Sequence, residues 1–206
     1  MQHLDQLGKP DRLWLSGAAT LLPLLVMASA SHAAPQTFTV LNEAGQPLAQ
    51  AVVSVVTSRG EKPNGAGTVV DMGQRNRQFT PTVVAVPVGG AVNFPNYDTV
   101  RHHVYSFSAT KKFEIKLYAG TPAAPVVFDK PGTVTLFCEV HDHMYGVILV
   151  VDSPHFARTD ADGNFRLEGL PAGTHTFKVW LSPKQTVDRT VDLKPGENTV
   201  DWTKAS

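Results

Sequence analysis

Cysteine is nearly absent from this sequence, which has one in 206 residues, and only 17% of the residues are charged. A single cysteine leaves the chain without an internal disulfide. Lysine plus arginine and aspartate plus glutamate number 18 each, so no excess of positive charge favours a nucleic-acid partner. The 42% of hydrophobic residues excludes a disordered chain and suffices for one large or two small cores.

Helical periodicity is also missing from the sequence beyond residue 33. Sixteen glycines and fifteen prolines interrupt the chain, and no long run repeats its apolar residues with the period of a helix. Short apolar or alternating runs between clusters of Gly, Pro, Asn and Asp predict strands instead. The spacing of these runs predicts an all-β fold, a sandwich or a barrel. The expected strands are 37–40, 51–57, 82–87, 91–95, 126–129, 133–137, 146–151, 164–168, 175–180, 189–193 and 198–202.

The one apolar stretch long enough to be a signal peptide or a membrane anchor lies at the N-terminus. Lys9 and Arg12 precede the apolar run Leu13–Ala30, which is followed by small residues. This pattern predicts a signal peptide at 1–33, cleaved after Ala33, and export to the periplasm. An uncleaved anchor is the alternative, but glycine and proline interrupt the run and it is barely long enough to span a bilayer. We expect no membrane span after cleavage.

The single cysteine lies in a cluster of soft and borderline metal ligands. Cys138, His141 and Met144 fall within seven residues, and thiolate, imidazole and thioether belong to the donor set of blue copper sites. Such a site needs a second imidazole, and the upstream segment 94–104 offers His102 and His103. An odd cysteine in an oxidising compartment is either a hazard or a functional thiol, and copper ligation would remove the hazard.

Two other readings of the cluster are weaker. A lone cysteine is usually a small buried hydrophobe, but this one stands beside histidine and methionine at ligand spacing. Cys138 and His141 could also suggest a nucleophile with its base, yet a pair three residues apart with a methionine after it suits a metal better than catalysis. No enzyme motif is recognised, so we do not expect an enzyme.

Two segments of the sequence resemble the cupredoxin family of blue copper proteins. Cys138-x-x-His141-x-x-Met144 is similar to the ligand loop of amicyanin, and Asn93-Phe94, eight residues before His102, resembles the upstream ligand segment of plastocyanin. The resemblance covers about residues 66 to 152. It implies a Greek-key β-barrel that binds copper as Cu(I) or Cu(II). The ligands that it implies are His102, Cys138, His141 and Met144.

The sequence departs from the family at two places near the site. His103 stands where the family commonly has an asparagine that braces the two ligand loops, and Glu139-Val140 replaces the usual Thr-Pro pair. The first departure leaves the stiffness of the site open. It also leaves open whether His103 enters the metal site. Whether His143, on the other segment, enters it is a separate open question.

The segments outside the copper region resemble a second fold. Residues 159–180 are similar to the second half of a carboxypeptidase regulatory-like, transthyretin-like β-sandwich, and residues 38–55 resemble its first half. We therefore predict a cupredoxin domain at 60–152 inserted into a discontinuous sandwich of 34–59 and 153–206. The alternative is a cupredoxin with an extra N-terminal strand, followed by a separate C-terminal module.

These features together predict a periplasmic electron-transfer protein. The resemblance implies an electron exit near His141 and Tyr145 and a redox partner protein such as a dehydrogenase or a cytochrome. Cupredoxins with the amicyanin-type loop are associated with amine oxidation, so methylamine utilisation is one implied context. One alternative is copper storage or delivery, with His103 and His143 joining the site. The other is a module whose outer sandwich binds a carbohydrate or a protein.

Overall fold

The computed structural model describes residues 36–42, 44–56, 61–122, 124–170 and 172–194. These residues contain sixteen strands and no helix, so the predicted all-β class is confirmed. Every predicted strand range that lies within them overlaps an observed strand. The predicted signal peptide at 1–33 and the expected strand 198–202 lie outside the described residues.

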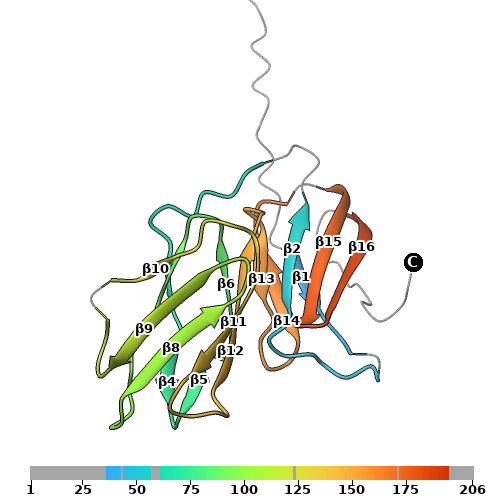
Figure 1. Cartoon of the computed structure of the whole chain (residues 1–206). Helices are drawn as coiled ribbons and strands as arrows, with labels where there is room; N and C mark the ends of the chain where they lie inside the picture. Colours follow the sequence, from blue (N-terminus) through green and yellow to red (C-terminus); the bar gives the residue numbers. More distant parts are fainter. Residues whose placement is uncertain (1–35, 43, 57–60, 123, 171, 195–206) are drawn as a thin grey trace, which may run out of the picture. The chain divides into compact units, whose positions relative to one another are not determined.

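A five-stranded sheet is the largest sheet in the predicted copper region (Figure 1). Neighbouring strands in it are antiparallel except β6 and β12, which run parallel. In sheet order the strands are β6 (Val83–Pro87), β12 (Tyr145–Val151), β11 (Gly132–Cys138), β8 (His102–Phe107) and β9 (Lys112–Tyr118). The two central strands that matter most for the site, β8 and β11, are therefore direct neighbours.

Two smaller sheets lie on the other side of the core that the large sheet covers. One has the order β10 (Val126–Val127), β7 (Ala91–Asn93) and β3 (Val69–Asp71), and the other pairs β4 (Gly73–Arg75) with β5 (Gln78–Thr80). Their apolar side chains form one buried cluster with those of the large sheet. Strand β11 shows how the large sheet contributes to this cluster, because its side chains alternate between its two faces. Val134, Leu136 and Cys138 are buried, while the residues between them are more exposed.

The remaining strands form a second group with its own core. The four-stranded sheet has the order β13 (Phe156–Arg158), β2 (Val52–Val56), β15 (Gly173–Ser182) and β16 (Gln185–Leu193), and a two-stranded sheet pairs β1 (Gln36–Thr39) with β14 (Asn164–Leu167). Stacked Phe38 and Phe165, with ring centroids 4.8 Å apart, lie in the core of this group together with Phe177.

Strands from the two ends of the described chain pair with each other in this second group. β1 pairs with β14, and β2 lies between β13 and β15. An insertion of the copper region into an outer sandwich requires pairings of this kind. The division of the chain at 34–59, 60–152 and 153–206 stays a prediction. Among the described residues, no helix has the length and apolar composition needed to cross a membrane.

Candidate metal centre

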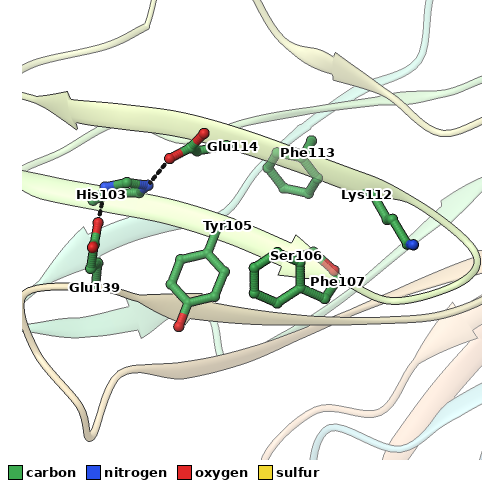
Figure 2. A pocket seen from close by; sticks show the side chains of 8 residues that line it. All are labelled: His103, Tyr105, Ser106, Phe107, Lys112, Phe113, Glu114 and Glu139. Atoms are coloured by element: carbon green, nitrogen blue, oxygen red, sulfur yellow. Dashed lines mark ion pairs between the residues drawn. The ribbon is translucent and has the colours of Figure 1, made fainter.

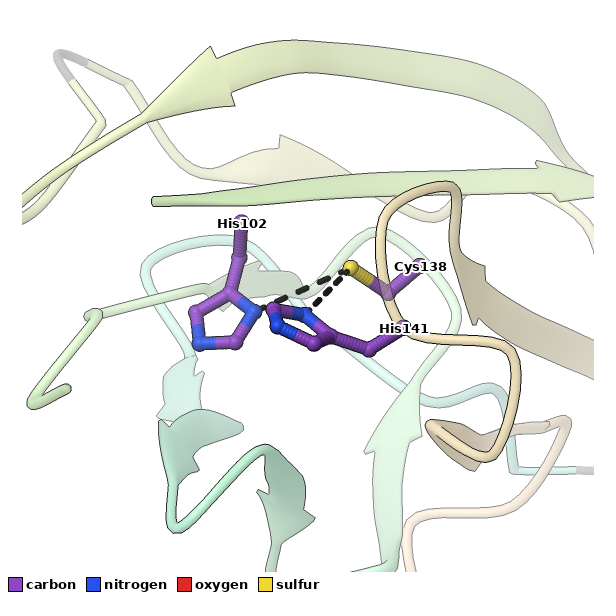
Figure 3. Close-up of side chains that lie close together, drawn as sticks. All are labelled: His102, Cys138 and His141. Atoms are coloured by element: carbon purple, nitrogen blue, oxygen red, sulfur yellow. Dashed lines mark hydrogen bonds between the residues drawn. The ribbon is translucent and has the colours of Figure 1, made fainter. Parts of the chain in front are cut away.

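Two neighbouring strands and the turn after one of them bring three metal-binding side chains together. His102 is the first residue of β8, Cys138 is the last residue of β11, and His141 lies in the turn between β11 and β12. Figure 3 shows both imidazole rings directed at the sulfur. The distance from Cys138 Sγ to Nδ1 is 3.7 Å for His102 and 3.6 Å for His141. The three ligand atoms all lie within 4.8 Å of one another.

The centre is buried on one side and more open on the other. His102 is fully buried and the exposed fraction of Cys138 is 3%, whereas His141 is half-buried. The two imidazole rings lie 4.9 Å apart between centroids. His141 is therefore the member of the group that comes nearest to solvent.

Met144 closes the turn that carries His141. Its backbone N–H donates a hydrogen bond of 2.9 Å to the carbonyl of His141. The side chain is buried in the same core cluster as Cys138. The structure thus brings together His102, Cys138 and His141, and it places Met144 in the same core cluster as Cys138, while its role as a fourth ligand stays a prediction.

Asp98 holds the ring nitrogen of His102 that faces away from the sulfur. The distance between His102 Nε2 and Asp98 Oδ2 is 2.8 Å, and the same carboxylate accepts backbone hydrogen bonds from Asn76 at 2.6 Å and Arg77 at 2.9 Å. Because a carboxylate accepts, Nε2 is the donor, and in the neutral ring this leaves the lone pair on Nδ1, which faces Cys138. The arrangement fixes the ring in the tautomer that a metal needs.

Electrostatics at Asp98 agree with this arrangement. Burial raises the pKa of the Asp98 carboxyl, but hydrogen bonds from Arg77, His102 and Asn76 outweigh it, so the pKa lies below the usual 3.8. Asn76 and Arg77 can both donate because they occupy the turn between β4 and β5 with φ of 54° and 56°. Sequence reasoning missed Asp98, and the only signal for it was a carboxylate four residues before a candidate ligand.

The pKa of His141 is shifted downward. Burial is the largest cause, and His102 and Arg77 add to it. A lower pKa favours the neutral imidazole, which is the form that binds metals.

The other two candidate histidines lie outside this group. His103 contacts Glu114 and Glu139 through its two ring nitrogens, at 3.0 and 2.7 Å. His143 is exposed, and its ring centroid is 6.3 Å from that of His141. Of the two adjacent histidines on β8, the structure therefore directs His102, and not His103, at Cys138.

The donor set fits a copper ion. A thiolate and two imidazoles combine a soft ligand with two borderline nitrogens, and such sets bind copper in both of its common oxidation states. His102 and His141 supply the nitrogens and Cys138 the sulfur, and Met144, in the same core cluster as Cys138, carries a thioether. The strands hold these side chains at one end of a packed core, which favours a site of fixed shape.

No protein-family model and no curated protein matches this sequence. Among solved structures, the chain is similar to a purple cupredoxin from Nitrosopumilus maritimus at 20% identity, over 41% of this chain and 99% of that one, with a TM-score of 0.35. It is similar to amicyanin from Paracoccus versutus at 18% identity, over 48% of this chain and 97% of that one, with a TM-score of 0.34.

A copper-containing nitrite reductase from Thermus scotoductus is also similar, at 21% identity over 56% of this chain and 28% of that one, with a TM-score of 0.37. Cupredoxins are thus among the solved structures that are similar to this chain, as the ligand-loop motif led us to expect.

Proposed function

We propose that this chain is a periplasmic electron carrier with a type 1 copper site. The observation that carries the proposal is the convergence of His102 Nδ1 and His141 Nδ1 on Cys138 Sγ, at 3.7 and 3.6 Å. Copper would supply one-electron chemistry by cycling between Cu(I) and Cu(II). The predicted signal peptide at 1–33 supports export.

The residues of the site divide the work of electron transfer between them. Cys138 provides the thiolate, and His102 and His141 provide nitrogens whose positions the strands and Asp98 fix. Met144 would provide a weak thioether donor. A site held in one geometry suits both oxidation states, so little has to move when an electron arrives or leaves.

Electrons would enter and leave at the edge where His141 lies. His141 is half-buried, and Tyr145, one residue after Met144, is 38% exposed. We propose that this surface meets a redox partner protein such as a dehydrogenase or a cytochrome. Catalytic metal sites keep an open position for substrate, whereas Met144 would fill the fourth position here, so we propose a carrier and not an enzyme.

The domain arrangement completes the proposal. Residues 60–152 would form the copper domain, and 34–59 with 153–206 would form an outer sandwich around it. The pairing of β1 with β14 and of β2 with β13 and β15 supports this division. For the outer sandwich we propose that it binds a carbohydrate or a protein.

The visible spectrum of the copper-loaded protein tests the proposal. We expect the protein to be intensely blue, violet or green, because of a charge-transfer band between the Cys138 thiolate and Cu(II). Reduction should remove this colour reversibly. A pale protein with only weak ligand-field absorption would contradict electron transfer. It would favour copper storage or delivery, for which the exposed His143 near His141 could add a ligand.

Alanine at each of the two adjacent histidines separates their roles. We expect His102→Ala to open a coordination position, so that the copper protein is pale until external imidazole fills the gap. His103→Ala should stay coloured, because its ring contacts glutamates and not the sulfur. Absorption spectra with and without imidazole make the comparison. If imidazole rescue is instead needed by His103→Ala, the assignment of His102 is wrong.

A further inference from the structure

His103 lies between two carboxylates on the surface beside the metal centre. Its Nδ1 is 2.7 Å from Glu139 Oε2 and its Nε2 is 3.0 Å from Glu114 Oε1 (Figure 2). The His103 side chain is only 11% exposed, while those of Glu114 and Glu139 are 53% and 67% exposed. A nearly buried ring is thus held at both ends by groups that reach it from two different segments.

The chain positions of the pair link it to the site. His103 directly follows His102 on β8, and Glu139 directly follows Cys138 at the end of β11. The contact between them therefore joins the residues that stand next to two of the three converging side chains. Glu114, on β9, has no such neighbour.

Backbone pairing ends just where this side-chain contact begins. β8 and β11 are antiparallel, and the pairing given by their register runs from Phe137↔Tyr105 to Cys138↔Val104. One further step in the same register sets Glu139 opposite His103. On the other side of β8, the pairing with β9 shifts its register between His102 and Val104, and such irregularities disrupt the ladder locally.

We propose that His103 and Glu139 are positioning residues for the metal centre. Their pair extends the connection between β8 and β11 by one residue, and so it fixes His102 Nδ1 and Cys138 Sγ near each other before any metal binds. Glu114 contacts the other ring nitrogen but follows no candidate ligand in the sequence, so it takes no part in this positioning. The proposal rests on the proposed function only in taking His102 and Cys138 as metal ligands.

The alternative is that these contacts are ordinary surface ion pairs. Exposed pairs contribute little on average, so their presence alone does not decide the matter. Glu114 provides a matched control, because Glu114→Ala removes one carboxylate from the same ring without touching a residue next to a ligand. Glu139→Gln provides a second control, because the amide oxygen still accepts a hydrogen bond although the charge is gone.

The first measurement uses the metal-free protein and the alkylation rate of its single cysteine, Cys138, by iodoacetamide. Cys138 is 3% exposed, so the rate reports local opening of the segment. We expect Glu139→Ala to react roughly two- to fivefold faster than the unmodified sequence, the range that a lost exposed pair implies. Glu114→Ala and Glu139→Gln should react at nearly the original rate. Equal rates for Glu139→Ala and Glu114→Ala, or for Glu139→Ala and Glu139→Gln, would overturn the proposal.

The second measurement uses the copper-loaded variants. We expect the charge-transfer band and the Cu(II) electron paramagnetic resonance spectrum to change in Glu139→Ala and to stay unchanged in Glu114→Ala and Glu139→Gln. Unchanged spectra in all three variants would contradict the positioning role. If the unmodified protein is pale with copper, the proposed function fails, and the alkylation rates still decide whether the pair positions Cys138.

Discussion

Cys138→Ser is expected to abolish the colour of the copper-loaded protein and nearly all of its electron-transfer activity. The thiolate is the group that donates charge to Cu(II) in the intense band, and it is the strongest covalent link between metal and protein. A serine hydroxyl at the same place is harder and does not ionise at neutral pH. The visible spectrum and voltammetry of the variant measure both effects.

The fold should survive this substitution, which makes the result interpretable. Serine is close to cysteine in size, and the core around it is packed from β11, β12 and their neighbours without help from a metal. Circular dichroism and thermal melting of the metal-free variant provide the control. A folded Cys138→Ser protein that remained coloured and transferred electrons would contradict the assignment of the copper site.

The part of the site that lies close together in the sequence was also the part that could be predicted from it. Cys138, His141 and Met144 fall on one strand end and one turn, so their spacing already limits how far apart they can be. His102 comes from another strand, and only the pairing of β8 with β11 brings it to the sulfur. Sequence spacing cannot supply that distance. The residues alone offered both His102 and His103 as the second imidazole, and the family resemblance selected His102.

Two features near the site were not predicted, because polar residues are usually expected at the surface and these polar residues are buried or hydrogen-bonded at the site. β8 was not among the expected strands, since it begins with two histidines that count as polar although His102 is fully buried. Asp98 was missed because its importance comes from three hydrogen bonds, two of them from a turn more than twenty residues away in the sequence. The local sequence around Asp98 does not indicate these hydrogen-bond donors.

In the second group too, the positions of the strands could be predicted from the sequence, but their pairings could not. The alternation of apolar residues located β2 and β15 from sequence, because each needs one buried face. Their pairing across the copper region, from Thr176↔Val56 to Trp180↔Val52, is a long-range contact that periodicity does not encode. A resemblance of two separate segments to halves of one sandwich suggested it.

Replacement of Met144 is expected to shift the reduction potential while the colour remains. A thioether donates weakly to Cu(II), so Met144→Leu would remove a donor, destabilise the oxidised ion and raise the potential. Met144→Gln introduces a harder oxygen donor, stabilises Cu(II) and lowers the potential. We expect shifts of roughly tens to about two hundred millivolts, and since about 59 mV is tenfold in a one-electron equilibrium, such shifts can reverse the direction of exchange with a partner.

Met72 provides a matched control for this prediction. It is a fully buried methionine in the same core cluster as Met144 and belongs to neither ligand segment. Met72→Leu conserves volume and should leave the potential where it was, at a modest cost in stability. If Met144→Leu is as silent in voltammetry as Met72→Leu, and Met144→Gln is silent too, Met144 is a core residue and not a ligand. The centre would then have three protein ligands, with His143 as our candidate for the fourth.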